Sequence, residues 1–229
     1  MQLDWQITMA DRWRMEYPGA SIGMLAMGQV ANPERHDRLD ERKAKLELEL
    51  RSRFDGYDRR AFKALPILSA YGEFYRRFGK TYHVQLQLES LVLKGKPIPK
   101  VAALVEAMFM AELENQLLTA GHDLDRVVMP VQVAVAQGSE AYVKLNGQEQ
   151  VLKAGDMFIA DARGVMSSVL YGPDRRTSIT PSTRRVLFTV YAPPGVDAAS
   201  VATHLDDLRS NVMLVSENAQ VEVVEVYNA

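Results

Sequence analysis

The spacing of apolar positions changes along the chain from a helical period to a strand period. Residues 99–115 carry apolar side chains at helical spacing, which predicts a helix with a buried face. From residue 128 the period becomes two, and Val131, Val133 and Val135 alternate with other residues as in a strand. Helices early in the chain and strands later indicate the α+β class.

The same patterns predict the remaining elements. Helices are expected over residues 33–53, 66–78, 84–94 and 197–211, and strands over residues 21–30, 141–145, 157–160, 165–171, 186–191 and 221–227. Asn146-Gly147 is a strong turn signal for a hairpin. Residues 119–123 are expected to form an irregular stretch after the long helix. We therefore expect a central, mostly antiparallel sheet flanked by helices.

Residues 32–53 are predicted to form a capped helix with a solvated face. Asn32-Pro33-Glu34 supplies an N-cap residue, a first-turn proline and an acidic first turn. Glu41 and Lys45 lie four residues apart in the favourable order, and further Glu–Arg pairs follow the same spacing. A helix that binds RNA would be less evenly balanced in charge, so we expect this face to contact water.

The composition limits both the chemistry and the partners. The 229 residues are 47% hydrophobic and 24% charged, as in an ordinary globular protein. The absence of cysteine excludes disulfides, thiolate nucleophiles and cysteine-ligated metal sites. The net charge is −2 and the pI about 6.1, whereas a protein that binds nucleic acid over its whole surface is usually basic. Any RNA contact is therefore expected to be local.

No targeting or membrane segment is visible in the sequence. The first residues carry neither the basic region nor the apolar core of a secretory signal. The longest apolar stretches fall far short of the roughly 20 residues that a membrane helix requires. We expect a cytoplasmic protein that has no membrane partner.

Common signatures of catalysis and metal binding are weak in this chain. Residues 19–23 match the G-x-S-x-G pattern around Ser21, but that motif needs a preceding strand and a following helix. A proline precedes it and an extended apolar stretch follows, which favours a chance match. The four histidines are scattered singly, so no metal site is expected. No Walker A or dinucleotide fingerprint occurs, and no cofactor is expected.

The densest polar cluster of the chain lies at residues 174–185. It contains five hydroxyls and four guanidiniums, those of Arg175, Arg176, Arg184 and Arg185. Arginine forms bidentate, charge-assisted hydrogen bonds with phosphate or carboxylate, so the segment is a candidate RNA-phosphate site. Alternatively, the serines and threonines cap the turns of a connection and the arginines face water.

Short motifs in a fixed order lie between residues 99 and 193. They are Leu-Val-Glu at 104–106, Ala-Gly-His-Asp-Leu-Asp at 120–125, Gly-Ser-Glu at 138–140, Leu-Asn-Gly-Gln-Glu at 145–149, Ile-Ala-Asp at 159–161 and Ile-Thr-Pro-Ser-Thr at 179–183. In order and spacing, this stretch resembles the editing domain formed by the third and fourth modules of the phenylalanyl-tRNA synthetase β subunit. Residues 66–99 resemble the upstream helical part of its stand-alone relatives. Residues 1–229 are then expected to form a single domain, with an N-terminal strand and a charged helix in residues 1–65.

The resemblance implies a central sheet flanked by helices and the hydrolysis of tyrosine wrongly attached to phenylalanine tRNA. The family's threonine–asparagine pair falls on Met108 and Phe109, and its turn histidine falls on Ala120. Its alanine–glycine pair falls on Ser167 and Ser168, and the glutamate that recognises tyrosine falls on Thr189. None of these functional side chains is retained, and His122 lies two residues after the histidine position. The candidate pocket residues are therefore Met108, Phe109, His122, Ser167, Ser168 and Thr189.

Two functions fit these observations. One is a tRNA-binding or aminoacyl-tRNA-editing-like protein, which would act as a trans-acting deacylase. Its altered pocket residues would suit another amino acid, and its arginines would bind the tRNA terminus. Hydrolysis there would use water and assistance from the substrate. The other is a non-catalytic module that binds a small amino-acid-like molecule or free tRNA. A hydrolase that uses Ser21 is the least favoured alternative.

Overall fold

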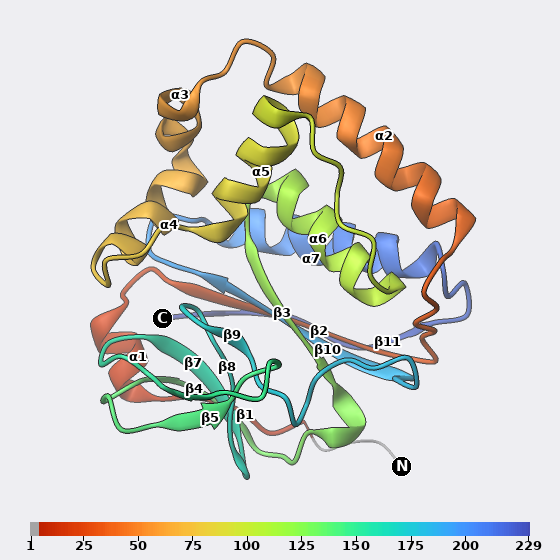
Figure 1. Ribbon diagram of the computed structural model, residues 1–229. Coiled ribbons are helices and arrows are strands. Elements are labelled where there is room, and N and C mark those ends of the chain that lie inside the picture. Colours follow the sequence, from red (N-terminus) through yellow and green to blue (C-terminus); the bar gives the residue numbers. More distant parts are fainter. Residues whose placement is uncertain (1–4) are drawn as a thin grey trace.

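A four-stranded sheet lies between a layer of helices and a second, five-stranded sheet (Figure 1). The computed structural model describes residues 5–229. The four-stranded sheet is antiparallel and has the order β11 (Gln220–Asn228), β2 (Ser21–Gly28), β10 (Arg185–Ala192) and β3 (Leu118–Asp123). The second sheet has the order β1 (Ile7–Met9), β4 (Val131–Val135), β7 (Met157–Asp161), β8 (Gly164–Ser168) and β9 (Gly172–Pro173). Only its β1–β4 pair is parallel within the described chain.

Most helices lie on one side of the four-stranded sheet (Figure 1). These are α2 (Asp37–Arg53), α3 (Arg59–Ala64), α4 (Pro66–Arg76), α5 (His83–Lys94), α6 (Ala103–Asn115) and α7 (Ala198–Met213). The short helices α1 (Asp11–Glu16) and η1 (Leu124–Arg126) lie outside this layer. Helix α7 approaches β2 closely at Gly23, where a Cβ atom would lie 2.6 Å from Val201 Cγ1. The predicted α+β fold with antiparallel strands flanked by helices is confirmed.

Strand β2 is buried along its whole length between β11 and β10. Its run of small and apolar residues suits a strand that packs on both faces. Ser21 begins this strand, and its hydroxyl donates to Asn228 Oδ1 at 2.8 Å. A strand and not a helix begins at Ser21, so the strand–turn–helix geometry of a nucleophile elbow is absent at this position.

The predicted hairpin at Asn146-Gly147 is present. It joins β5 (Ala141–Val143) to β6 (Glu149–Val151) in antiparallel register. Gly147 adopts φ +82°, and its N–H donates to Lys144 O at 2.9 Å. A residue without a Cβ suits this left-handed position.

Two predicted elements are corrected by the structure. Residues 119–123 are not irregular, because they belong to β3, whose six residues are all buried. The sequence pattern did not indicate a strand here, because three of its residues are polar. Each of these side chains has a hydrogen-bond partner inside the protein. The strand expected over residues 165–171 ends at Ser168, where the Ser168 hydroxyl accepts a hydrogen bond from Tyr171 N–H at 3.2 Å and the chain turns.

Asn32 does not cap the helix that follows it. Helix α2 begins at Asp37, and Asn32 is buried, with 4% of its surface exposed. Its Oδ1 accepts the Leu104 N–H at 2.9 Å, in the first turn of α6, while its Nδ2 donates to Thr180 O at 3.0 Å. The predicted capping residue therefore caps a helix that lies far away in the sequence.

Replacing Asn32 by Ala should destabilise the protein by about 1–3 kcal/mol, because it leaves the buried Leu104 N–H unpaired, whereas Thr180 O keeps its hydrogen bond from Thr183 N–H. The free energy of unfolding in urea measures this change. The exposed Asn218 offers a matched control, and its replacement by Ala should cost less than about 0.5 kcal/mol. Equal losses at the two positions would contradict the capping role of Asn32.

Candidate functional site

A cleft of about 300 Å³ lies between helices α5 and α6, strand β3 and the segment that follows β8. Its walls are mainly apolar. The apolar side chains that line it are those of Val105, Met108, Phe109, Leu118, Ala120, Leu145, Pro173 and Ile179. Four lining residues of α6, at positions 105, 108, 109 and 112, follow the i, i+3, i+4, i+7 spacing of one helix face.

The polar groups of the cleft are few and include no lysine or arginine. They belong to His83, Gln87, Glu112, Thr119 and Ser178. Glu112 is only 2% exposed, and its Oε1 accepts the Thr119 N–H at 2.8 Å. Burial raises the pKa of Glu112 to about 8, so at neutral pH the carboxyl group is largely protonated and neutral. A neutral carboxyl group can donate as well as accept a hydrogen bond.

One wall of the cleft covers the free edge of β3. Asp123 N–H donates to Thr177 O at 2.7 Å, and His122 forms an isolated antiparallel bridge with Ser178. The next residue, Ile179, packs against Gly121, where a Cβ atom would lie 2.6 Å from Ile179 Cδ1. Pairing of the β3 backbone thus places Ser178 and Ile179 at the cleft.

His122 lies behind the cleft in a fully buried polar network. Its Nδ1 is 2.8 Å from Thr177 Oγ1, and its Nε2 is 3.1 Å from Ser167 Oγ. Thr177 donates its hydroxyl proton to Asp174, so it accepts from His122 Nδ1–H, which leaves Nε2 to accept from Ser167. Burial, with a contribution from Arg176, lowers the pKa of His122 to about 3, so the imidazole is neutral.

The hydroxyl groups predicted for the pocket have separate environments. Ser167 Oγ is 2.6 Å from the buried Tyr191 hydroxyl, which links β8 to β10. Ser168 accepts from the turn at Tyr171. Thr189 lies directly opposite Ala120 in the β10–β3 pair, and its hydroxyl is buried with no hydrogen-bond partner among residues 5–229.

The six candidate pocket residues therefore fall into two groups. Met108 and Phe109 line the cleft. The other four are buried in β3, β8 and β10, with at most 2% exposed, and none of them lines it. Ala120 lines the cleft and lies opposite Thr189 in the β10–β3 pair, so strand β3 separates Thr189 from the cleft.

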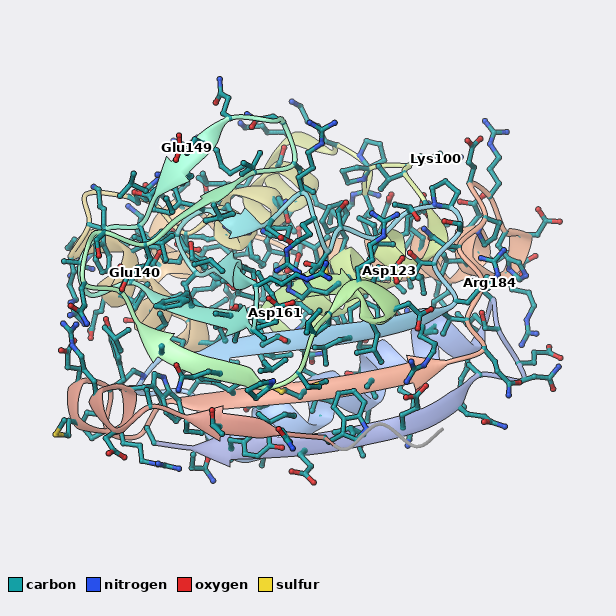
Figure 2. All side chains as sticks on the ribbon, turned by 90° about the horizontal axis from the view of Figure 1, so that it is seen from below. Lys100, Asp123, Glu140, Glu149, Asp161 and Arg184 are labelled. Atoms are coloured by element: carbon teal, nitrogen blue, oxygen red, sulfur yellow. The ribbon has the colours of Figure 1, made fainter. Side chains whose placement is uncertain are left out.

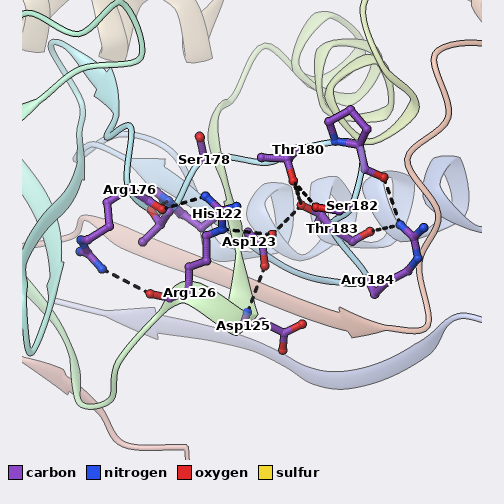
Figure 3. Close-up of polar contacts among 12 residues, drawn as sticks. His122, Asp123, Asp125, Arg126, Arg176, Ser178, Thr180, Ser182, Thr183 and Arg184 are labelled. Atoms are coloured by element: carbon purple, nitrogen blue, oxygen red, sulfur yellow. Dashed lines mark hydrogen bonds and ion pairs between the residues drawn. The ribbon is translucent and has the colours of Figure 1, made fainter.

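The four arginines of residues 174–185 do not converge on one site. Arg176 forms a bidentate pair with Asp161, at 2.8 and 2.9 Å, and Arg185 pairs with Glu222 and Asp125. Figure 3 shows Arg176 bonded to the Arg126 carbonyl and Arg184 bonded to main-chain carbonyls of its own turn.

Of these four arginines, Arg175 and Arg184 have no carboxylate partner within residues 5–229. Arg175 lies against the β5–β6 turn, where its Nη1 would be 3.5 Å from a Cβ at Gly147. In Figure 2, Arg184 lies toward the opposite end of the molecule from Glu149 of that hairpin. The two guanidiniums without a carboxylate partner are therefore far apart.

The sequence patterns predict no role for His83 or Glu112. A signal for Glu112 was available, because an acidic residue at position 112 interrupts an otherwise apolar helix face. His83 gives no comparable signal, since only the fold brings the start of α5 to the cleft. Within residues 5–229, no group of three His, Asp or Glu side chains is placed to hold a metal ion.

Comparisons with known proteins identify the family. The B3/4 domain profile matches residues 69–216 of the chain. The chain belongs to the B3/4 domain family. This B3/4 protein is similar to the phenylalanine–tRNA ligase β subunit of Mycoplasma genitalium, with 29% identity over 69 residues. The aligned segment covers 30% of this chain and 9% of that protein.

The fold of this B3/4 protein is also similar to a solved structure. An N-terminal fragment of the phenylalanyl-tRNA synthetase β subunit from Pyrococcus horikoshii superposes with a TM-score of 0.51 at 10% identity. The match covers 100% of this chain and 55% of that one. The chain thus spans little more than half of the structural relative and about a tenth of the sequence relative. The predicted resemblance to the synthetase β subunit is confirmed.

None of the helices among residues 5–229 is both long and apolar enough to cross a bilayer.

The Glu112 carboxyl group should make stability depend on pH. Its pKa is about 8 in the folded protein and about 4.3 in an unfolded chain, so the unfolded state loses this proton first and stability falls from pH 5 to pH 8. Glu112→Gln keeps an acceptor for the Thr119 N–H and removes the titration. Relative to the wild type, we expect this variant to gain more than about 1 kcal/mol between pH 5 and pH 8 in urea unfolding. A constant difference between the two proteins across this range would refute the raised pKa.

Proposed function

We propose that this B3/4 protein binds the aminoacylated 3′ end of a tRNA and holds the amino-acid side chain in the cleft between α5, α6 and β3. The observation that carries the proposal is the composition of this cleft, which is apolar and lacks any lysine or arginine. The relatives named above, both synthetase β subunits, support tRNA as the partner. Such a partner is consistent with a cytoplasmic protein.

The size of the cleft suits one side chain. Its volume of about 300 Å³ lies at the lower end of the range for small-molecule sites, about 300–1,000 Å³. Phe109 provides a flat part of its wall and Met108 a flexible part. The thioether side chain of Met108 can adapt to ligands of different shape. An apolar side chain would bury its surface here, and the neutral Glu112 carboxyl group offers one hydrogen bond beside it.

The charges favour an ester over a free amino acid. A free amino acid carries a carboxylate, and burying an anion without a cationic partner is costly. No lysine or arginine lines the cleft, so such a carboxylate has no strong partner there. In aminoacyl-tRNA the same carboxyl group is an uncharged ester. This difference weighs against the alternative of a module that binds a free amino-acid-like molecule.

The nucleophile that hydrolyses the ester in this cleft would be a water molecule. The chain has no cysteine, and the hydroxyl of Ser21 is bonded within the sheet. Desolvation lowers the pKa of His83, so this lining imidazole is neutral at pH 7 and can accept a proton. We therefore propose water attack assisted by His83, with binding contributed by the apolar walls.

A panel of tRNAs charged with different amino acids tests the proposal. The protein should bind and deacylate those that carry apolar side chains faster than uncatalysed hydrolysis. Met108→Trp fills the cleft and should weaken both effects by about tenfold or more. Met15→Trp is the matched control, because Met15 is 73% exposed on α1 and should leave them unchanged. His83→Asn should reduce deacylation by about 100-fold with little change in binding.

The outcomes separate the candidate functions. Binding of aminoacyl-tRNA without deacylation would remove the enzymatic part and keep the binding part. Stabilisation by a free amino acid, with no preference for aminoacyl-tRNA, would favour the amino-acid-binding module instead. Failure of every charged tRNA to bind would overturn the proposed function.

A further inference from the structure

We infer that a basic surface on α3, α4 and the loop before α5 binds the RNA backbone of the tRNA. The surface is defined by Lys63, Arg76 and Lys80, which line one cleft of about 230 Å³. This inference rests on the proposed function and adds to it a second site, which receives phosphates and lies apart from residues 174–185.

The three cations of the basic surface are not neutralised by the protein. No carboxylate lies within 4.0 Å of Lys63, Arg76 or Lys80 among residues 5–229, and no acidic residue lines their cleft. Lys63 and Arg76 are exposed, and Lys80 is half-buried. In a protein of net charge −2, where Arg176 and Arg185 are paired with acids, three unpaired cations around one cleft form a local positive site.

The surface continues into a neighbouring cleft. Arg76 also lines a hollow of about 440 Å³ together with Arg77, whose guanidinium lies 5.2 Å from the ring centroid of Tyr17. Glu73 is the one acidic residue that lines this second hollow. The basic residues therefore form a strip along the end of the helical layer where Figure 1 shows α3 and α4.

The basic surface begins at the rim of the apolar cleft. Lys80 Nζ lies 4.5 Å from the ring centroid of Tyr171, and the next two residues, Gly172 and Pro173, line the apolar cleft. His83, the first residue of α5, lines that cleft three residues after Lys80. An RNA strand with its aminoacyl group in the cleft could thus pass Lys80 first and then reach Arg76 and Lys63.

The donors of this surface suit phosphate better than a protein partner. Besides the cations, the hydroxyls of Ser69 and Thr81 line the cleft, and neither makes a hydrogen bond within residues 5–229. Phosphate oxygens accept from arginine, lysine and hydroxyl groups, and such contacts position a nucleic acid without reading its sequence. Protein interfaces depend instead on buried aromatic or aliphatic anchors, and the exposed residues of this cleft are mostly polar.

Binding of an uncharged tRNA transcript, followed by fluorescence anisotropy at 50–200 mM KCl, tests the inference. The variant Lys63→Gln, Arg76→Gln, Lys80→Gln should bind about tenfold or more weakly at 50 mM salt, and the slope of log K against log salt should fall by about 2 units. The control variant Arg38→Gln, Lys45→Gln, Arg209→Gln removes three ion-paired surface cations. Both variants shift the net charge from −2 to −5, so only the position of the charges differs.

The single variants Arg76→Gln and Lys80→Gln make the test independent of folding of the triple variant, and each should weaken binding about threefold. A non-hydrolysable aminoacyl-adenosine, which has no tRNA body, should bind the triple variant as it binds the wild type. If that ligand binds and the basic-surface variants bind tRNA like the control, the inference fails while the proposed function stands. If neither ligand binds the wild type, both fail. Tighter binding of polyglutamate than of tRNA would overturn the inference in favour of an acidic protein partner.

Discussion

The pairing of strand β3 is the constraint on which the candidate site depends. This strand lies at the edge of the four-stranded sheet, and all six of its residues are buried. Buried backbone groups must find partners, and an uncovered edge would leave a row of them unpaired. The segment after β9 covers part of the edge, because Thr177 O accepts the Asp123 N–H and Ser178 forms a bridge with His122. Glu112 accepts the Thr119 N–H. The covering segment and α6 then stand as opposite walls of one cleft.

The same strand separates two environments of different chemistry. On the cleft side, Ala120 and Gly121 are small, which leaves room for a ligand beside Met108 and Phe109. Behind them, His122, Ser167 and Tyr191 form a fully buried network that joins the two sheets. Burial keeps the imidazole neutral and the Glu112 carboxyl group protonated, so the region around the cleft carries little charge. Positive charge is placed outside it, on the loop and helices that precede α5.

The sequence predicted the elements whose patterns are local. The apolar periodicity of α6, the buried run of β2 and the Asn146-Gly147 hairpin all agree with the structure. Strand β3 was not predicted, because its polar side chains are bonded to partners more than 40 residues away in the sequence, such as Thr177 for His122. Asn32 was misassigned for the same reason. Of the candidate site, Met108 and Phe109 were named through the family resemblance. The roles proposed for His83 and Lys80 depend on the start of α5 and the loop before it, whose positions only the fold determines.

We propose above all that an aminoacyl group enters the cleft between α6 and β3. The methyl groups of the chain's 11 methionines provide direct probes of this site. Titration of ¹³C-methyl-methionine protein with a non-hydrolysable aminoacyl-adenosine should shift the NMR signal of Met108, which lines the cleft, and leave that of the exposed Met15 on α1 unchanged. Saturable binding of the ligand with no change at Met108 would contradict the account.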